Sequence, residues 1–294
     1  MQASFLSIYL MPMAIAIIMV GLGLSLTLAD FKRIFEFPKA VLIGLITQML
    51  LLPAICLVIA DYFQLEPALA VGLMLLAAAP GGPSANLYSH IAGGDVALNV
   101  TLTALNSVMS IFSLAWIVNF SLAYFMQAEA YVPLQFQKVL EVCAMIITPI
   151  SLGMWIRYRF PSFAQGMEGK VKLLSGLFLA LLIILAGLKE IDHLMHDIRS
   201  VGMAALTFNL TCLFVGYFLP RLFRLPPKQA VAISMEVGIH NGSLAIYIAL
   251  SILNNGAMTI PAVVYSLIMF ITAAIFAFLL KKNRPPKFFV LLWP

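Results

Sequence analysis

Nine apolar stretches, each about long enough to cross a lipid bilayer, are separated along this chain by short clusters of charged residues. A helix needs about 20 mostly apolar residues to span the hydrocarbon core. The stretches are approximately 5–28, 39–60, 67–92, 96–125, 133–156, 172–189, 200–220, 229–253 and 258–280. They use most of the 294 residues. The sequence therefore predicts an all-α polytopic membrane protein with nine transmembrane helices, in a single transmembrane domain covering 1–294.

Composition supports this class and excludes others. Hydrophobic residues make up 63% of the chain and charged residues 10%, with a mean hydropathy of +1.04. Soluble domains average about 25% charged residues. That deficit excludes an ordinary soluble enzyme and a nucleic-acid-binding protein, despite a sequence pI near 9.1. Membrane lipid is the expected neighbour.

The basic residues predict an orientation. Fourteen of the 17 Lys and Arg residues fall in or beside loops that follow odd-numbered stretches and in the C-terminal tail, whereas Lys138, Lys189 and Arg199 lie on the other side. Cytoplasmic loops carry the excess of Lys and Arg. We therefore expect a multi-pass protein of the inner or plasma membrane, with its N-terminus outside and its C-terminus in the cytoplasm.

Two of the apolar stretches contain helix-breaking residues near their midpoints. The stretch 67–92 includes Pro-Gly-Gly-Pro at 80–83, and the stretch 229–253 includes Glu236, Gly238, His240, Asn241 and Gly242. Proline lacks a helical donor, and glycine has a high conformational cost in a helix. Non-helical backbone at membrane depth is tolerated only where it is buried in protein or lines a cavity. Two broken helices in corresponding halves of a chain indicate a secondary transporter built from inverted repeats.

Glu236 is the one formally charged residue between Gln229 and Leu280. A carboxylate at mid-membrane costs about 2.5–3.5 kcal/mol on insertion scales. Three interpretations are open: a protonated core carboxyl, an ion pair with another helix, or a ligand for a cation from solution. No Lys or Arg lies deep enough in a predicted transmembrane stretch to form the ion pair. The surrounding polar residues favour a ligand for a cation.

Oxygen-bearing side chains gather near the two breaks, as a hard cation such as sodium requires. Asn86 follows the first break, Gln48 lies midway through the second stretch, and Thr101 lies in the fourth. Asn99, Thr103 and Asn106 are spaced i, i+4, i+7 and form one helical stripe. Such a stripe can also hold helices together by hydrogen bonds. Together with the breaks and Glu236, it favours a cation site.

Four short motifs in order along the chain resemble those of the bile acid:sodium symporter family. They are TQMLLLP (47–53), PGGPSAN (80–86), GDVALNVTLT (94–103) and EVGIHN (236–241). The resemblance covers most of the chain. It implies that the two broken helices cross within a core bundle, approximately 39–125 and 200–280. This bundle would move against a panel formed by approximately 5–28 and 133–189.

The resemblance also implies two sodium sites that share Glu236. The first would use Asn86, Asn99, Thr103 and Glu236. The second would use Gln48, Glu236, His240 and the backbone carbonyls of Val237 and Ile239. An unwound segment leaves such carbonyls without helical partners.

This chain departs from the family pattern at several of these positions. Ala85 and Asn99 stand where serine is usual, and Pro83 replaces a threonine near the substrate. His240 replaces the usual glutamine, and imidazole is a poorer sodium ligand than an amide and titrates near neutral pH. Proton coupling through Glu236 and His240 is therefore an alternative to sodium coupling.

The breaks also indicate the charge of the substrate. Helix N-termini favour anions, and two half-helices would start near Ser84 and Asn241 at the membrane midplane. We expect a small-molecule organic anion, either bile acid-like or a small carboxylate, with Asn86, Asn241 and Pro83 at its site. The predicted function is sodium-coupled symport of this anion by alternating access, with no cofactor besides the coupling ions. An intramembrane enzyme using Glu236 and His240 as an acid–base pair is the alternative from another class, and an enzyme is not expected.

Overall fold

The computed structural model describes residues 11–126, 136–167 and 191–282, together with 169–171, 174, 177 and 181. Within these ranges the regular secondary structure is helical, apart from one isolated β-bridge. This confirms the prediction of an all-α membrane protein. Part of the first predicted stretch and most of 172–189 lie outside the described residues, as does the tail after 282.

The N-terminal half begins with a bent pair of helices and continues into the first broken helix. Its α-helices are α1 (Met11–Ser25), α2 (Leu28–Lys32), α3 (Pro38–Ile46), α4 (Leu52–Tyr62), α5 (Pro67–Ala78), α6 (Ala85–Ala92) and α7 (Val96–Phe125). A π-helical turn, Thr47–Leu51, joins α3 to α4. Pro53 follows it and has no N–H to donate to the preceding turn, which favours this widened geometry.

The C-terminal half contains the second broken helix. Its α-helices are α8 (Phe136–Arg159), α10 (Ile191–Leu222), α11 (Pro227–Gly238), α12 (Gly242–Tyr247) and α13 (Ile260–Lys282). A π-helical turn, Ile248–Ile252, extends α12, and a short 3-10 helix, Ala257–Thr259, precedes α13. The helix expected at 200–220 is longer than predicted, because α10 already begins at Ile191.

Both expected breaks are present. The chain leaves helical geometry between α5 and α6 at 79–84, and between α11 and α12 at 239–241. Among the described residues, four continuous helices are long and apolar enough to cross a membrane, and counting each of two bent helix pairs as one span raises this to six. The four are Pro38–Tyr62, Leu140–Arg159, Arg199–Leu222 and Ala257–Leu280. The halves of the broken helices are individually too short to qualify, so a count of the described helices by length does not reach nine.

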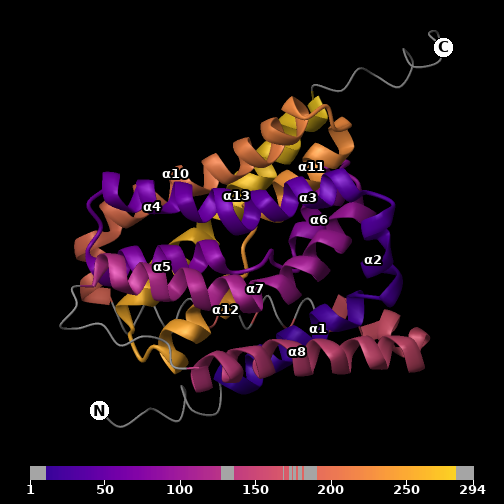
Figure 1. The fold of residues 1–294 in the computed structure, drawn as a ribbon, viewed down its shortest axis with the longest axis horizontal. Coiled ribbons are helices and arrows are strands. Elements are labelled where there is room, and N and C mark those ends of the chain that lie inside the picture. Colours follow the sequence, from indigo (N-terminus) through magenta and orange to yellow (C-terminus); the bar gives the residue numbers. More distant parts are fainter. Residues whose placement is uncertain are drawn as a thin grey trace.

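Helices α1 and α8 form a closely packed pair (Figure 1). A Cβ atom added at Gly23 would collide with the carbonyl of Ile150, and one added at Gly153 would collide with that of Val20. Glycine at these two positions therefore allows the two backbones to touch. Figure 1 shows the pair along the lower edge of the molecule, with α12 and α7 next to it.

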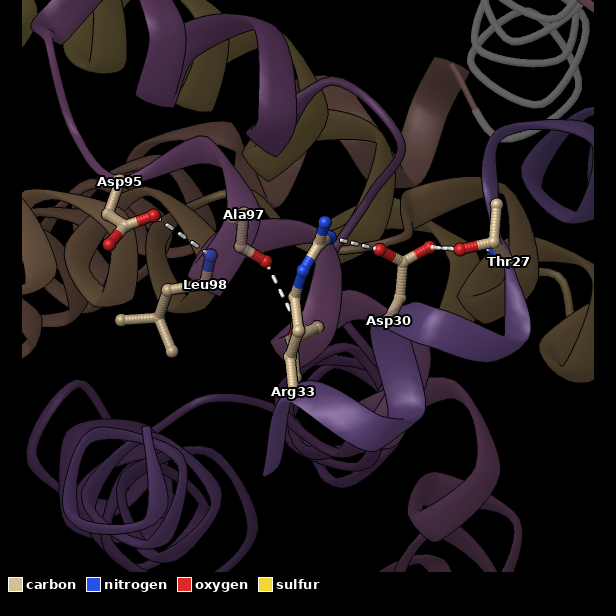
Figure 2. A network of polar contacts seen from close by, with 7 residues as sticks. Thr27, Asp30, Arg33, Asp95, Ala97 and Leu98 are labelled. Atoms are coloured by element: carbon tan, nitrogen blue, oxygen red, sulfur yellow. Dashed lines mark hydrogen bonds and ion pairs between the residues drawn. The ribbon is translucent and has the colours of Figure 1, made fainter. Parts of the chain in front are cut away.

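A polar group connects α1 to the rest of the bundle at a sharp corner. The chain turns by 69° between Ile15–Ser25 and Leu28–Phe35. At this corner the buried carboxylate of Asp30 accepts hydrogen bonds from the backbone N–H and the hydroxyl of Thr27, both at 2.7 Å, and pairs with Arg33. Figure 2 shows this group beside the start of α7, where Asp95 accepts a hydrogen bond from the N–H of Leu98.

Candidate cation and substrate site at the crossing of two broken helices

The two unwound segments meet and hydrogen bond to each other. Gly81 and His240 form an antiparallel β-bridge. The N–H of Gly82 donates to the carbonyl of Ile239 at 2.7 Å, and the N–H of Asn241 donates to the carbonyl of Pro80 at 2.9 Å. Each break thus supplies partners for backbone groups that lipid would leave unsatisfied. The crossing that the sequence predicts is held by the backbone of both segments.

Glycine at position 81 allows an acidic side chain to approach this crossing. A Cβ atom added at Gly81 would collide with the carboxylate of Glu236. One added at Gly82 would lie 3.0 Å from the carbonyl oxygen of His240. The glycines therefore serve close approach as well as the break itself.

Glu236 lies in the last turn of α11 with 0% of its surface exposed. The hydroxyl of Thr103 donates to its Oε2 at 2.6 Å, and Nδ2 of Asn106 donates to its Oε1 at 3.0 Å. Both donors come from α7. Nδ2 of Asn99, also on α7, donates to the carbonyl of Ala232 on α11 at 2.7 Å. The predicted stripe of Asn99, Thr103 and Asn106 is therefore one face of α7, and it is directed at α11.

Several buried amide oxygens are left without hydrogen-bond donors among the described residues. They are Oδ1 of Asn86, Asn99 and Asn106, and Oε1 of Gln48. An unsatisfied buried polar group costs about 1–3 kcal/mol. Oxygen acceptors on the helices that meet at a buried carboxylate are the ligands that a hard cation prefers. By contrast, the described residues contain no cluster of three His, Cys, Asp or Glu side chains of the kind that holds a transition metal.

The residues of the second predicted ligand set also lie at the crossing, with most of their polar atoms already engaged. Nε2 of Gln48 donates to the carbonyl of Ala79 at 3.1 Å and lies 3.4 Å from Nδ1 of His240. The carbonyl of Ile239 accepts from Gly82, so it is not free in the way the break alone suggests. The N–H of Asn241, the regular helical donor for the carbonyl of Val237, bonds to Pro80 instead.

His240 is enclosed by aromatic and thiol groups. Its ring stacks on Phe208 with centroids 5.8 Å apart, and it meets Tyr265 edge-on at 5.4 Å. Nδ1 lies 3.3 Å from the carbonyl oxygen of Ala79, and Nε2 lies 3.9 Å from Sγ of Cys212. If a cation binds to the second predicted ligand set, one of these ring nitrogens has to leave its present neighbour.

The three predicted substrate residues flank the same crossing. Asn241 is 3% exposed; its Oδ1 accepts from the N–H of Leu244 at 3.1 Å and so caps α12, while its Nδ2 has no partner within the described ranges. Asn86 lies in the first turn of α6, and the half-buried Pro83 precedes that helix. Asn241 thus offers a buried donor that a small anion could accept from.

One polar group at the crossing contains none of the residues predicted for the site. The carbonyl of Gly238, directly before the second break, accepts from Nδ2 of Asn209 at 2.9 Å and from the hydroxyl of Tyr265 at 3.1 Å. Thr272 in turn donates to Oδ1 of Asn209. The available signal was a lone asparagine in the middle of the apolar part of α10. Asn106 belongs to the predicted stripe but to neither predicted sodium ligand set.

Sequence comparisons agree with this architecture. The sequence model described as the Sodium Bile acid symporter family matches residues 12–197, more than half of the chain. The chain is 31% identical to the P3 protein of Homo sapiens over 249 residues, which are 81% of this chain and 50% of that protein. It is 30% identical to the sodium/bile acid cotransporter 4 of Mus musculus over 242 residues (79% and 53%).

A plant relative matches over a longer part of the chain. The probable sodium/metabolite cotransporter BASS1 of Arabidopsis thaliana chloroplasts is 22% identical over 271 residues, which are 92% of this chain and 66% of that protein. The chain spans about half the length of the P3 proteins that it matches. On the family match, this chain belongs to the Sodium Bile acid symporter family, which consists of transporters and not of enzymes.

Proposed function

We propose that this chain is a sodium-coupled secondary active symporter of an organic anion. The observation that carries the proposal is the buried carboxylate of Glu236, which lies at the crossing of two broken helices together with unpartnered amide oxygens. A carboxylate at this depth costs free energy, and a sodium ion bound by it would offset that cost.

The cation site is formed by Asn86, Asn99, Thr103 and Glu236. These residues come from α6, α7 and α11, so a bound ion ties the two broken helices to the long helix between them. A second ion at Gln48, His240, Glu236 and the carbonyls of Val237 and Ile239 is part of the same proposal. It requires that a ring nitrogen of His240 leave its present neighbour, whereas Oε1 of Gln48 is already without a partner among the described residues. Proton coupling at this second position is the alternative.

The substrate is a monovalent organic anion that binds beside the crossing, with Asn86, Asn241 and Pro83 around it. The free Nδ2 of Asn241 and the N-terminus of α6 supply the attraction for its negative charge. Because the sodium ligands and the substrate donors share Asn86 and the α11–α12 break, sodium binding orders the groups that bind the anion. This shared framework couples the two fluxes.

Transport proceeds by alternating access in a nine-helix bundle of inverted repeats. The core, approximately 39–125 and 200–280, moves against the panel, approximately 5–28 and 133–189. The antiparallel bridge between Gly81 and His240 supports a two-fold relation between the broken helices. The close α1–α8 pair supports a panel that moves as a unit. The N-terminus faces outward and the C-terminus lies in the cytoplasm.

Uptake into proteoliposomes tests this proposal. A labelled bile acid, pantoate or pyruvate is supplied with an inward sodium gradient, with choline in place of sodium at fixed pH, or with a proton gradient alone. Symport predicts accumulation of at least one unaltered anion above its equilibrium level with sodium and not with choline. Accumulation that follows the proton gradient and ignores sodium would contradict sodium coupling and favour the proton-coupled alternative.

A further inference from the structure

Asn106 is a buried residue beside Glu236 with no role in the ligand sets considered above. It lies one turn beyond Thr103 on α7 and has 0% of its surface exposed. Its Nδ2 donates to Oε1 of Glu236 at 3.0 Å. Its Oδ1 is buried and lacks a hydrogen-bond partner among the described residues. The amino end of the amide therefore bonds to the carboxylate, and its oxygen end is unused.

A carboxamide in this position can act in two ways. The amino end is a donor and the oxygen end is an acceptor. With the amino end directed at Glu236, the amide satisfies a bare carboxylate. A half-turn about the Cβ–Cγ bond exchanges the amino group and the oxygen, and so brings the oxygen to the same place. That oxygen can bind a cation, but it cannot donate a hydrogen bond to a carboxylate that has no cation beside it.

The neighbouring donors do not have this freedom to the same extent. Nδ2 of Asn99 is held by the carbonyl of Ala232 at 2.7 Å, which fixes the orientation of its amide. The hydroxyl of Thr103 lies 2.6 Å from Oε2 of Glu236 and 3.0 Å from the carbonyl oxygen of Asn99. Asn106 is the amide whose amino group is bonded to the acid itself, so its orientation depends directly on what the acid binds.

The number of available oxygens points the same way. Asn86, Asn99, Thr103 and the two oxygens of Glu236 supply fewer oxygen ligands than the roughly six that small hard cations gather. Oδ1 of Asn106 would add one more from the stripe that already faces α11.

We propose, on the basis of the sodium site proposed above, that Asn106 is a further cation ligand. Its amide exchanges roles during the cycle: the amino group donates to Glu236 when the site is empty, and the oxygen binds the ion when the site is loaded. Asn106 thereby keeps the buried acid hydrogen-bonded in the empty carrier, and it tunes affinity and selectivity in the loaded one.

Sodium titration of the thermal stability of the purified full chain tests this role. Asn106→Leu retains the size of the side chain and removes both polar ends. Ser121→Ala is the matched control, because Ser121 is equally buried on α7 but its hydroxyl donates to the carbonyl of Val118. We expect the half-saturating sodium concentration to rise at least tenfold in Asn106→Leu and to stay within twofold of wild type in Ser121→Ala.

Selectivity separates a ligand from a packing residue. The ratio of the half-saturating lithium and sodium concentrations should change in Asn106→Ser, which keeps a shorter oxygen and serves if Asn106→Leu does not fold. A folded Asn106 variant with an unchanged sodium response and an unchanged lithium-to-sodium ratio would overturn the inference and leave the sodium site in place. A wild-type protein with no response specific to sodium would instead overturn the proposed function, and this inference with it.

Discussion

At the scale of single residues, the free-energy cost of burying the Glu236 carboxylate determines how much stabilisation its neighbours must supply. Its charge at mid-membrane costs about 2.5–3.5 kcal/mol. Hydrogen bonds between side chains in membrane proteins contribute about 0.6 kcal/mol each on average. The two donors, Thr103 and Asn106, therefore supply about 1.2 kcal/mol and fall short of this cost. The remaining deficit is the physical reason to expect a cation at Glu236.

His240 gives a prediction at the same scale. Changing His240 to glutamine replaces an imidazole that lies against the carbonyl of Ala79 and Sγ of Cys212 with a flexible amide beside Gln48, whose Nε2 lies 3.4 Å from Nδ1 of His240. We expect His240→Gln to increase the stabilisation of the purified protein by sodium, because an amide is the better sodium ligand. His90→Gln, at an exposed position on α6, should leave the sodium response unchanged. A sodium response of His240→Gln equal to that of wild type would exclude a cation at the second ligand set.

At the scale of elements, the two breaks fit each other and the side chain of Glu236. Gly81→Ala would place a methyl group against the carboxylate of Glu236. We expect it to displace the acid and to raise the half-saturating sodium concentration at least tenfold. Gly202→Ala in α10 is the control, because a Cβ atom there meets nothing within 4 Å. A normal sodium response in Gly81→Ala would show that the close approach of acid and break is dispensable.

The corner between α1 and α3 gives a prediction about stability. Asp30 is buried and accepts from Thr27 while it pairs with Arg33 (Figure 2). Removing the shared acceptor leaves these donors unsatisfied, so Asp30→Ala should destabilise the protein by about 1–3 kcal/mol. The apparent melting temperature in detergent measures this change. Glu36→Ala, at an exposed acid on the same segment, should stay within about 0.5 kcal/mol of wild type, and an equal loss in both variants would contradict a specific role for Asp30.

The sequence predicts those features of the helices that depend on neighbouring residues in the chain, such as helix-breaking residues and the spacing of polar side chains. Pro80, Gly81 and Gly82 determine the first break by their own chemistry, and the spacing of Asn99, Thr103 and Asn106 places them on one face of α7. The sequence could not show that Gly81 pairs with His240, or that Asn209 and Tyr265 hold the carbonyl of Gly238. These contacts join residues distant in the chain, and local spacing carries no information about them. The π-helical turns and the 69° corner likewise depend on how the helices pack.

At the scale of the whole molecule, α1 and α8 form a pair with its own glycine-mediated contact, whereas both broken helices pack with α7 and α13. Figure 1 shows the pair at one edge of the bundle. The sharp corner at α2 links the two parts. This arrangement is consistent with the proposed panel and moving core, and the proposed cation site lies wholly within the helices of that core.

The central claim is that Glu236 is present to bind sodium, and cation-dependent stability measures it most directly. The melting temperature of the purified protein is compared in sodium, potassium and choline at equal ionic strength, for wild type and for Glu236→Gln. We expect sodium alone to stabilise wild type. Glu236→Gln should lose this response and should be more stable than wild type in choline, because the buried charge is gone. An equal effect of potassium, or a sodium response retained in Glu236→Gln, would show that Glu236 is not a sodium ligand.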